Sequence, residues 1–379
     1  MSTRYPENLY SVKSHAFEAI PLPVFRELRN KEWVYFGADN LYPQKMIELY
    51  NGSAIHHTAI DAKTSAIKGE GFEVYGDTEI NRNGESLDAL FAKVALDYTL
   101  FGGFALNIIW NRAGDRVAEM YHLPFANVRS GKMDENDRVN EYYYSSDWSN
   151  TRKYTPSTYK SFDTMDNTGD NASQVYYFHE YTPGSDTYPL PAYVGAVNDI
   201  ELDARISRFH NANISQGLAP SLAINFRNGI PSSEERQAIL RDIEETFSGE
   251  MNAGRFFLLF SEAGKEAQIQ PIAAENDQYY ITLEERITSR LLTAHRITSP
   301  LLLGIRDGGG LGSNKDELLI AWGHYFGTVV EPEQKKLVSE FNWLTGKMGF
   351  GMDLNIKDSA ILLDEQTIET DTETEQILE

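Results

Sequence analysis

The sequence of 379 residues contains no cysteine, which excludes disulfide bonds, thiolate zinc sites and cysteine nucleophiles. It also contains no run approaching the roughly 18 consecutive apolar residues that a membrane span needs. Its polar first 15 residues lack the charged-then-apolar pattern of a signal peptide. We therefore expect no membrane partner, and we expect synthesis and assembly in the cytoplasm.

Basic side chains are scarce, with 34 Lys and Arg against 56 Asp and Glu, and the formal net charge is −22. Affinity for nucleic acid comes largely from cations that neutralise phosphates and release counterions, so tight DNA binding is disfavoured. An acidic surface can still surround DNA without holding it, because salt limits repulsion to about 8–10 Å. The charge favours passage of a polyanion over its capture.

Motifs of known catalytic or metal sites are absent from the sequence. Its eight histidines do not have the spacing of H-E-x-x-H, and His56 and His57 on one helix would point about 100° apart. There is no G-x-S-x-G elbow, and acidic segments 134–137 and 163–170 lack the glycine and glutamate positions of an EF-hand. We predict no catalytic residue, no metal ligand and no cofactor, and therefore not an enzyme.

Residues 306–315 form a glycine-rich segment, Arg-Asp-Gly-Gly-Gly-Leu-Gly-Ser-Asn-Lys. It does not have the G-x-x-x-x-G-K-[ST] spacing by which a phosphate loop presents successive N–H groups, so a nucleotide site is disfavoured. A flexible connector and a functional mobile loop both remain open on sequence alone.

The first half of the chain alternates helical and strand patterns. Helices are predicted from Tyr42-Pro43, from the cap Ser53 to Gly69, and from Ser86 to about residue 101. Strands are predicted at 104–110 and 117–123, which form a hairpin, and at 141–144 and 175–181. Residues 145–174 are rich in Ser, Thr, Asp and Asn, and predict a long, mobile surface loop.

From about residue 193 long helices dominate, at 193–217, 232–248, 277–299 and 314–347. Strands at 221–227, 255–260 and 268–272 surround the second helix, with 262–265 as the turn between the last two strands. Ser232 and Glu235 have the spacing of a capping box. The order is long helix, β-α-β-β insert, long helix. The last 16 residues, 364–379, carry seven acidic side chains and no basic one, which predicts a tail without a core.

The helix over 277–299 has an apolar stripe made by Leu283, Ile287, Leu291, Ala294 and Ile297. Glutamates and arginines flank this stripe, so one face can pack while the other carries both signs of charge. An ordinary amphipathic core helix and a helix that packs in a ring both fit this pattern.

Several short segments are each weak evidence alone, but the order in which they occur along the chain is informative. They are Phe36–Pro43, Ser53–His57, Gly69–Gly71, Phe101–Ala105, Leu123-Pro124, Pro189–Pro191, Gly249–Gly254, Ser299–Gly304, Asn314 and Glu331-Pro332. In this order, from about Tyr35 to Met348, the chain resembles the portal family of tailed bacteriophages.

The resemblance implies an α+β, portal-like fold. Its expected parts are an α/β wing (1–192), a first stem helix (193–217), a clip (218–276) and a second stem helix (277–305). A tunnel loop would follow, made by Arg306, Asp307, Gly308, Gly309, Gly310, Leu311, Gly312, Ser313 and Asn314. A long helix (315–350) would return to the wing, and an acidic tail (351–379) would end the chain, with the crown small or absent.

The resemblance also implies a role in the virion, assembled in the host bacterial cytoplasm. The expected function is a homo-oligomeric ring of twelve subunits at one capsid vertex, through which double-stranded DNA is packaged and ejected. Its expected partners are the large terminase motor, the major capsid protein and a head–tail adaptor. The alternatives are a capsid-associated adaptor or scaffold and a polymer-degrading phage enzyme.

The clip helix carries the charged residues that we expect to meet the motor and the adaptor. They are Glu234, Glu235, Arg236, Arg241, Asp242, Glu244 and Glu245. A solvated helix face is the alternative interpretation of these charges.

Overall fold

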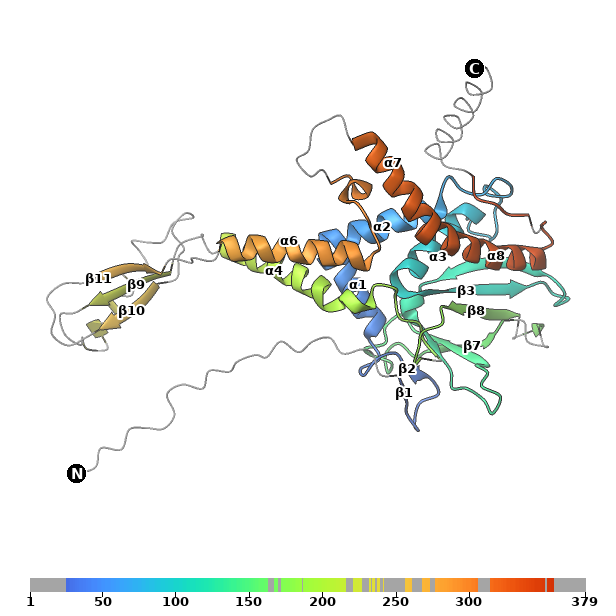
Figure 1. The fold of residues 1–379 in the computed structure, drawn as a ribbon. Helices are drawn as coiled ribbons and strands as arrows, with labels where there is room; N and C mark the ends of the chain where they lie inside the picture. The colour runs from blue at the N-terminus through green and yellow to red at the C-terminus, as the bar shows by residue number, and fades with distance from the viewer. Residues whose placement is uncertain are drawn as a thin grey trace, which may run out of the picture.

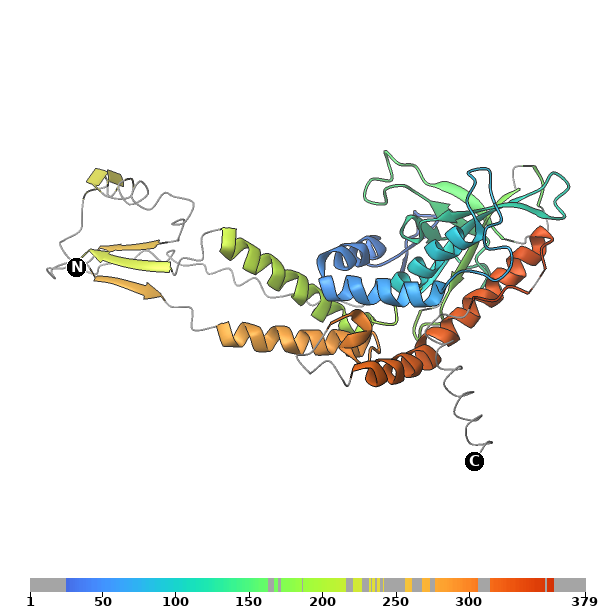
Figure 2. The same cartoon turned by 90° about the horizontal axis from the view of Figure 1, so that it is seen from above.

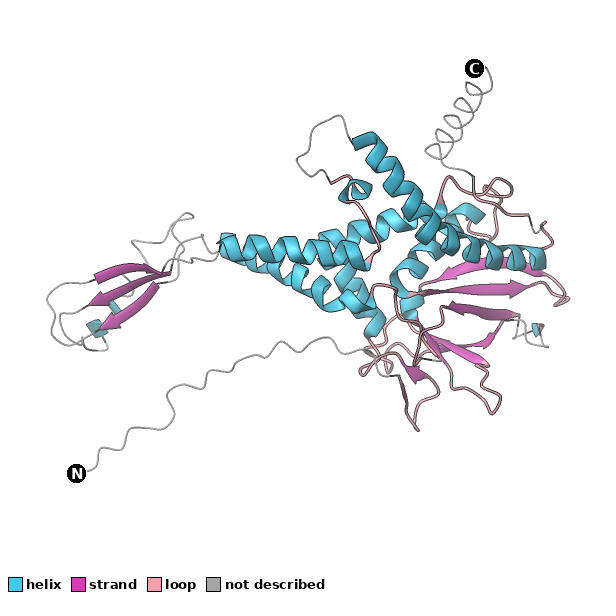
Figure 3. Ribbon diagram, viewed as in Figure 1, coloured by secondary structure: helices cyan, strands magenta, loops and turns pink. Residues whose placement is uncertain are grey.

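A pair of helices connects a larger α+β domain to a small three-stranded sheet (Figures 1 and 3). The view turned by 90° shows the same elongated arrangement, with the small sheet at the far end of the helix pair (Figure 2). The predicted α+β class is confirmed.

The structure is a computed structural model that describes residues 25–357 except 163–166, 170–171, 186, 216–220, 227–231, 233, 236, 239–240, 242–255, 261–267, 273–276, 306–313 and 352. Only the backbone is described for 213–215, 221–226, 256–260, 268–272, 277–281 and 314–316. None of the helices in this described part is long and apolar enough to cross a membrane.

Three helices follow a short antiparallel strand pair near the start of the described chain. The pair is β1 (Arg26–Glu27) and β2 (Val34–Tyr35), and the helices are α1 (Tyr42–Gly52), α2 (Ala54–Lys68) and α3 (Leu87–Phe101). The Ser53 side chain accepts from the His56 N–H, and the Ser86 side chain accepts from the Ala89 N–H, each at 3.2 Å. Each bond satisfies an amide that the first turn of a helix leaves unpaired. The predicted starts of α2 and α3 are confirmed.

A six-stranded sheet forms the centre of the larger domain. Its strands are β3 (Gly103–Trp110), β4 (Val117–Leu123), β5 (Val128–Ser130, after the 3-10 turn η1, Phe125–Asn127), β6 (Glu141–Tyr144), β7 (Ser157–Ser161) and β8 (Ser173–His179). They lie in the order β4-β3-β8-β7-β6-β5, and all neighbours are antiparallel except β7 and β8. The predicted hairpin of β3 and β4 is confirmed.

The long loop predicted over residues 145–174 is wrong in part, because β7 lies inside it and occupies an interior position of the sheet. Trp148, also in this segment, is buried, and its indole Nε1 donates to the Asn127 carbonyl at 2.9 Å. The sequence of β7, Ser-Thr-Tyr-Lys-Ser, is polar because this part of the sheet is largely exposed. Pairing with the neighbouring strands therefore makes β7 a strand, although its composition is typical of a loop.

Two adjoining hydrophobic cores cover opposite faces of β3. Phe104, Leu106 and Ile108 belong to the first core, which includes residues of α2, α3 and α8, whereas Ala105 belongs to the second. Successive side chains of a strand point to opposite faces, so burial on both sides explains why β3 is almost continuously apolar. The second core includes residues of α1, β2, β6 and the bases of α4 and α6.

The helix pair consists of α4 (Val197–Ser215), preceded by the 3-10 turn η3 (Val194–Ala196), and α6 (Asp277–Ala294). Between them lie β9 (Ser221–Phe226), β10 (Phe256–Phe260) and β11 (Gln268–Ile272), as predicted. Their order is β10-β9-β11, with β10 parallel and β11 antiparallel to β9. The last two predicted strands are not neighbours, because β9 lies between β10 and β11; residues 262–265, predicted as the turn between them, lie outside the described residues. Pro271 lacks an N–H, and it accordingly lies on an edge strand.

The chain then passes through the 3-10 turn η4 (Pro300–Leu303) into α7 (Asn314–Tyr325), the π-helical segment η5 (Phe326–Val330) and α8 (Glu331–Met348). The single helix predicted over 315–350 is thus two α-helices joined by a π-helical turn. Pro332 cannot donate a hydrogen bond back to the preceding turn, and the Thr328 hydroxyl bonds the His324 carbonyl at 2.6 Å. Both features disturb the regular ladder at this point.

Candidate functional site

The apolar stripe predicted on α6 packs inside the chain. Ile287, Leu291 and Ile297 are buried, and Leu283 and Ala294 are half-buried against the second core. Burying one such aliphatic side chain contributes roughly 1.5–3 kcal/mol, so the stripe anchors the base of the helix pair firmly to the larger domain. This is the behaviour of an amphipathic core helix, one of the two interpretations that the sequence left open.

Polar side chains on the other faces of α4 and α6 form contacts between the two helices. Arg290 lies 3.2 Å from Asp199, and His210 lies 3.3 Å from Glu284. The Arg290 side chain is 70% exposed, and exposed ion pairs contribute about 0–1 kcal/mol. The apolar base therefore holds the pair together more than its charges do.

A pair of buried histidines joins the end of α6 to the start of α2. His56 Nδ1 and His295 Nε2 are 2.9 Å apart, and the ring of Tyr193 lies 4.5 and 5.3 Å from the two imidazole centroids. His56 Nε2 is buried and makes no hydrogen bond among the described residues. An unbonded buried N–H is rarer than an unbonded acceptor, which favours the tautomer in which His56 Nδ1–H donates to His295.

Both histidines are neutral at pH 7. Burial, followed by the nearby His295 and His57, lowers the pKa of His56 to about 3. Burial and the charge of Lys63 lower the pKa of His295 to about 4. A proton on either ring would place a charge in this buried setting, and on His295 it would also face the charge of Lys63.

An ion pair between Lys63 of α2 and Glu333 of α8 adjoins the histidines. The Lys63 Nζ to Glu333 Oε1 distance is 2.7 Å, and the two side chains are only 10% and 19% exposed. A cavity of about 50 Å³ separates this pair from His295. Because α6 ends at this junction, contacts from α2, the segment before α4, and α8 together determine where the helix pair leaves the domain.

Arg129 of β5 is a second buried charge that sequence reasoning missed. Its guanidinium donates to Asn40 Oδ1 and the Asn40 carbonyl, both at 2.7 Å, and to the carbonyls of Ala126 and Val128 at 2.9 and 2.8 Å. Burial lowers its pKa to about 10, so the group remains charged at neutral pH. Arginine suits this position because its fixed fork of donors can satisfy several acceptors at once.

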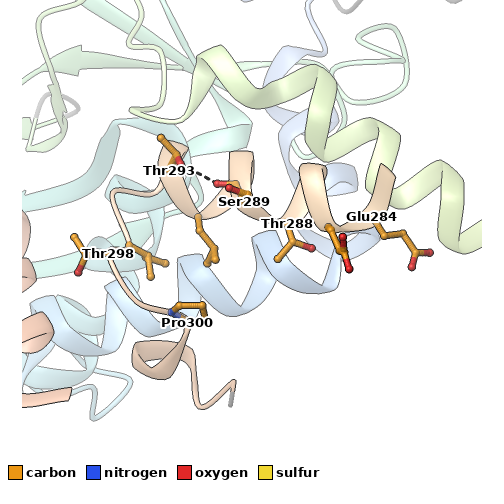
Figure 4. A pocket seen from close by; sticks show the side chains of 9 residues that line it. Glu284, Thr288, Ser289, Thr293, Thr298 and Pro300 are labelled. Carbon is orange, nitrogen blue, oxygen red and sulfur yellow. Dashed lines mark hydrogen bonds between the residues drawn. The ribbon is translucent and has the colours of Figure 1, made fainter. Parts of the chain in front are cut away.

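A shallow groove of about 630 Å³ runs along the exposed side of α6 (Figure 4). Most of the residues that line it are polar, among them Glu284 and Thr288, and two of its apolar lining residues, Leu292 and Ile297, are themselves buried in the first core. The groove has no cluster of acid, base and nucleophile. Across the part of the chain that the structure describes, no group of three or more His, Asp or Glu side chains is placed to hold a metal ion.

The structure describes only some of the residues predicted to form the clip surface. Glu234, Glu235 and Arg241 are exposed and helical. The capping box is confirmed: the Ser232 N–H donates to Glu235 Oε2 at 2.8 Å, and the Glu235 N–H donates to Ser232 Oγ at 3.3 Å. These bonds lower the pKa of Glu235. Outside the described residues lie Arg236, Asp242, Glu244 and Glu245, the tunnel-loop residues 306–313, and the tail from residue 358; only the backbone of Asn314 is described.

Local sequence patterns could not reveal the histidine pair, because its members are 239 residues apart. The one available signal was that His56 and His57 should face different directions. The structure confirms this, since His56 is buried whereas His57 is half-buried and lies 3.3 Å from Asp61.

Comparison with known proteins gives a clear likeness in fold and a weak one in sequence. No protein-family model matches this sequence. An uncharacterized protein of Rickettsia bellii (strain RML369-C) is 26% identical over 234 residues. The match covers 61% of this chain and spans about half, 55%, of that protein's length.

Among solved structures, a chain of the virion of a native gene transfer agent particle is 17% identical, with a TM-score of 0.58 and coverage of 88% of both chains. A chain of the neck of the native particle, computed with C12 symmetry, is 17% identical, with a TM-score of 0.57 and coverage of 86% and 87%. An HK97-family phage portal protein from Corynebacterium diphtheriae is 12% identical, with a TM-score of 0.48 and coverage of 84% of this chain and 96% of that one.

At 17% identity, the first two similarities show a shared fold. The chain therefore has the fold of a virion and neck component, and it has this fold over most of its length. The order of sequence segments therefore led to a fold that chains of a virion and of its neck share.

Proposed function

We propose that this chain is the subunit of a portal ring at one vertex of a phage or phage-like capsid, the channel for packaging and ejecting double-stranded DNA. The observation that carries the proposal is the helix pair α4/α6, anchored at its base in the α+β domain and bearing a small sheet at its far end (Figures 1 and 2). A component of a virion neck has this fold over 86% of our chain.

In this proposal each part of the fold has its own task within the virion. The larger domain is the wing, which packs against the major capsid protein. The helices α4 and α6 are the stem, and residues 218–276, which include the sheet β10-β9-β11, are the clip. Residues 306–314 are the tunnel loop, and α7 to α8 return the chain to the wing.

The charge of the chain fits a channel that does not retain DNA. Twelve subunits with a formal charge of −22 each carry 264 net negative charges, so phosphates are not drawn to the ring as a whole. Glu284 and Glu285 are exposed on α6, in keeping with this. Any attraction to DNA is therefore left to individual cations and not to the net charge of the ring.

The direct test is the state of the purified protein in solution. Native mass spectrometry should show a closed oligomer, expected to contain twelve subunits, and negative-stain images should show a ring with a central hole. A protein that stays monomeric or dimeric over a wide range of concentrations would contradict the proposal.

The clip is proposed to contact the packaging motor first and a head–tail adaptor later. Charge reversal at Arg236 and Arg241 should weaken motor binding while rings still assemble, because charged surfaces control the rate and specificity of docking. Reversal of exposed Lys335 on α8, far from the clip, is the matched control. Unchanged motor binding and packaging in the clip variant would remove this assignment.

The tunnel loop is proposed to project into the channel and to contact DNA transiently. Four glycines among residues 306–314 make many backbone conformations accessible. Replacing Gly308, Gly309 and Gly310 with alanine should slow or block DNA packaging in intact rings. Packaging at the normal rate would mean that the segment is only a connector.

A further inference from the structure

Glu333 of α8 carries a buried charge whose hydrogen bonds the described residues complete only in part. Its Oε1 accepts from Lys63 Nζ at 2.7 Å, whereas its Oε2 is buried and makes no hydrogen bond among the described residues. A carboxylate oxygen that is removed from bulk water needs a donor, because the loss of its solvation is otherwise not compensated. We therefore expect a further donor beside Glu333 Oε2.

Lys63 of α2 has donors to spare at the same place. Its ammonium group carries three N–H donors, and the bond to Glu333 uses one of them. The side chain is only 10% exposed, so bulk water has little access to it. His295 adds another donor, because in the tautomer in which its Nε2 accepts from His56 its Nδ1 carries the hydrogen.

The cavity of about 50 Å³ at this junction has Lys63, His295 and Glu333 in its lining. One water molecule needs roughly 10–15 Å³ of such volume, and ligand pockets are typically about 300–1,000 Å³, so only a very small molecule fits. A cation there would face Lys63 and Arg296, and an anion would face Glu333. A neutral molecule that both donates and accepts meets neither penalty, and water has these properties.

We propose that this cavity binds ordered water, which donates to Glu333 Oε2 and accepts from Lys63 Nζ. A buried water typically makes about three hydrogen bonds to polar groups that lack partners, and His295 offers the third here. The site lies between α2, the end of α6 and the start of α8, so the water is part of the joint at which the helix pair leaves the larger domain (Figure 1). This inference goes beyond the proposed function and does not depend on ring assembly.

Tyr325 of α7 is a competing partner for Glu333. Its hydroxyl is buried and makes no hydrogen bond among the described residues, and burial, followed by the charge of Glu333, raises its pKa. The two groups are thus near each other, and a direct bond from the Tyr325 hydroxyl to Glu333 Oε2 would take the place of the water. Tyr325→Phe distinguishes the two arrangements, because it removes this hydroxyl while the residues that line the cavity stay the same.

The first experiment is a crystallographic or cryo-EM map of the full chain at a resolution that shows ordered water. We expect a peak at about 2.5–3.2 Å from both Lys63 Nζ and Glu333 Oε2. The Tyr325→Phe variant should keep this peak. The double variant Lys63→Met, Glu333→Leu should lose it, because the ion pair that holds the water is gone and apolar side chains line the cavity instead.

The second experiment is urea unfolding of the Tyr325→Phe variant. If water satisfies Glu333 Oε2, the urea midpoint should stay unchanged or rise, since the substitution removes a buried hydroxyl that has no partner. A map of the original protein without the peak, a peak that persists in the double variant, or a clearly lower midpoint for Tyr325→Phe overturns the inference and leaves the portal proposal standing. If the double variant does not fold, the original map and the Tyr325→Phe variant still decide.

Discussion

The buried histidine pair predicts a specific sensitivity to acid. In the folded chain the pKa values of His56 and His295 are about 3 and 4, against 6.5 for an ordinary histidine. Between these values the unfolded chain binds protons that the folded chain does not. The contribution of the pair to the free energy of unfolding is therefore complete above pH 6.5 and decreases as the pH falls toward 4.

The size of the effect follows from proton linkage. One unit of difference in pKa corresponds to about 1.4 kcal/mol, so each histidine should remove about 2 kcal/mol between pH 7 and pH 5. Together the two should lower the free energy of unfolding by about 4 kcal/mol over this range. Ordinary carboxylates titrate mostly below this range, so the chief other groups that change charge within it are the remaining six histidines.

The assay is urea unfolding of dilute protein at a series of pH values from 7 to 5. Replacing both histidines with glutamine removes the titrating groups, so the variant should show a much flatter pH dependence, whatever its stability at pH 7. His57→Gln is the control, because it removes the adjacent, half-buried histidine from the same helix. If the double variant lost stability with acid as steeply as the original protein, the histidine pair would not be the cause.

Further predictions concern buried groups and DNA. Arg129→Lys should lower the free energy of unfolding by about 2–4 kcal/mol in chemical denaturation, because an ammonium cannot satisfy the acceptors that the guanidinium reaches; an unchanged midpoint would contradict this. Lys63→Met should cost about 3–5 kcal/mol by leaving a buried carboxylate, and adding Glu333→Leu should restore most of it, which a double-mutant cycle measures. Gly103→Ala should lower the melting temperature, because a Cβ there would lie 2.5 Å from a carbonyl of β8, whereas Gly195→Ala meets nothing within 4 Å and should not. Duplex DNA should bind only weakly and with strong salt dependence in an anisotropy titration, and submicromolar affinity at physiological salt would refute the electrostatic argument.

Sequence patterns predicted the elements that depend on near neighbours. The caps Ser53 and Ser86 and the Ser232–Glu235 box bond amides within three residues, so their spacing is visible in the chain itself. The order of helix, insert and helix, and the apolar stripe of α6, also follow from local periodicity. This local information was enough to indicate the fold that the structural comparisons support.

Only the tertiary structure decided how distant segments pair. Polar β7 belongs to the sheet because β6 and β8 supply its hydrogen bonds, and β9 separates β10 from β11 although the last two are consecutive. The histidine pair exists because α2 and the end of α6 are packed against each other, and nothing within either helix encodes that contact. Long-range pairing of this kind depends on the burial of whole surfaces, so it cannot be read from the periodicity of any one segment.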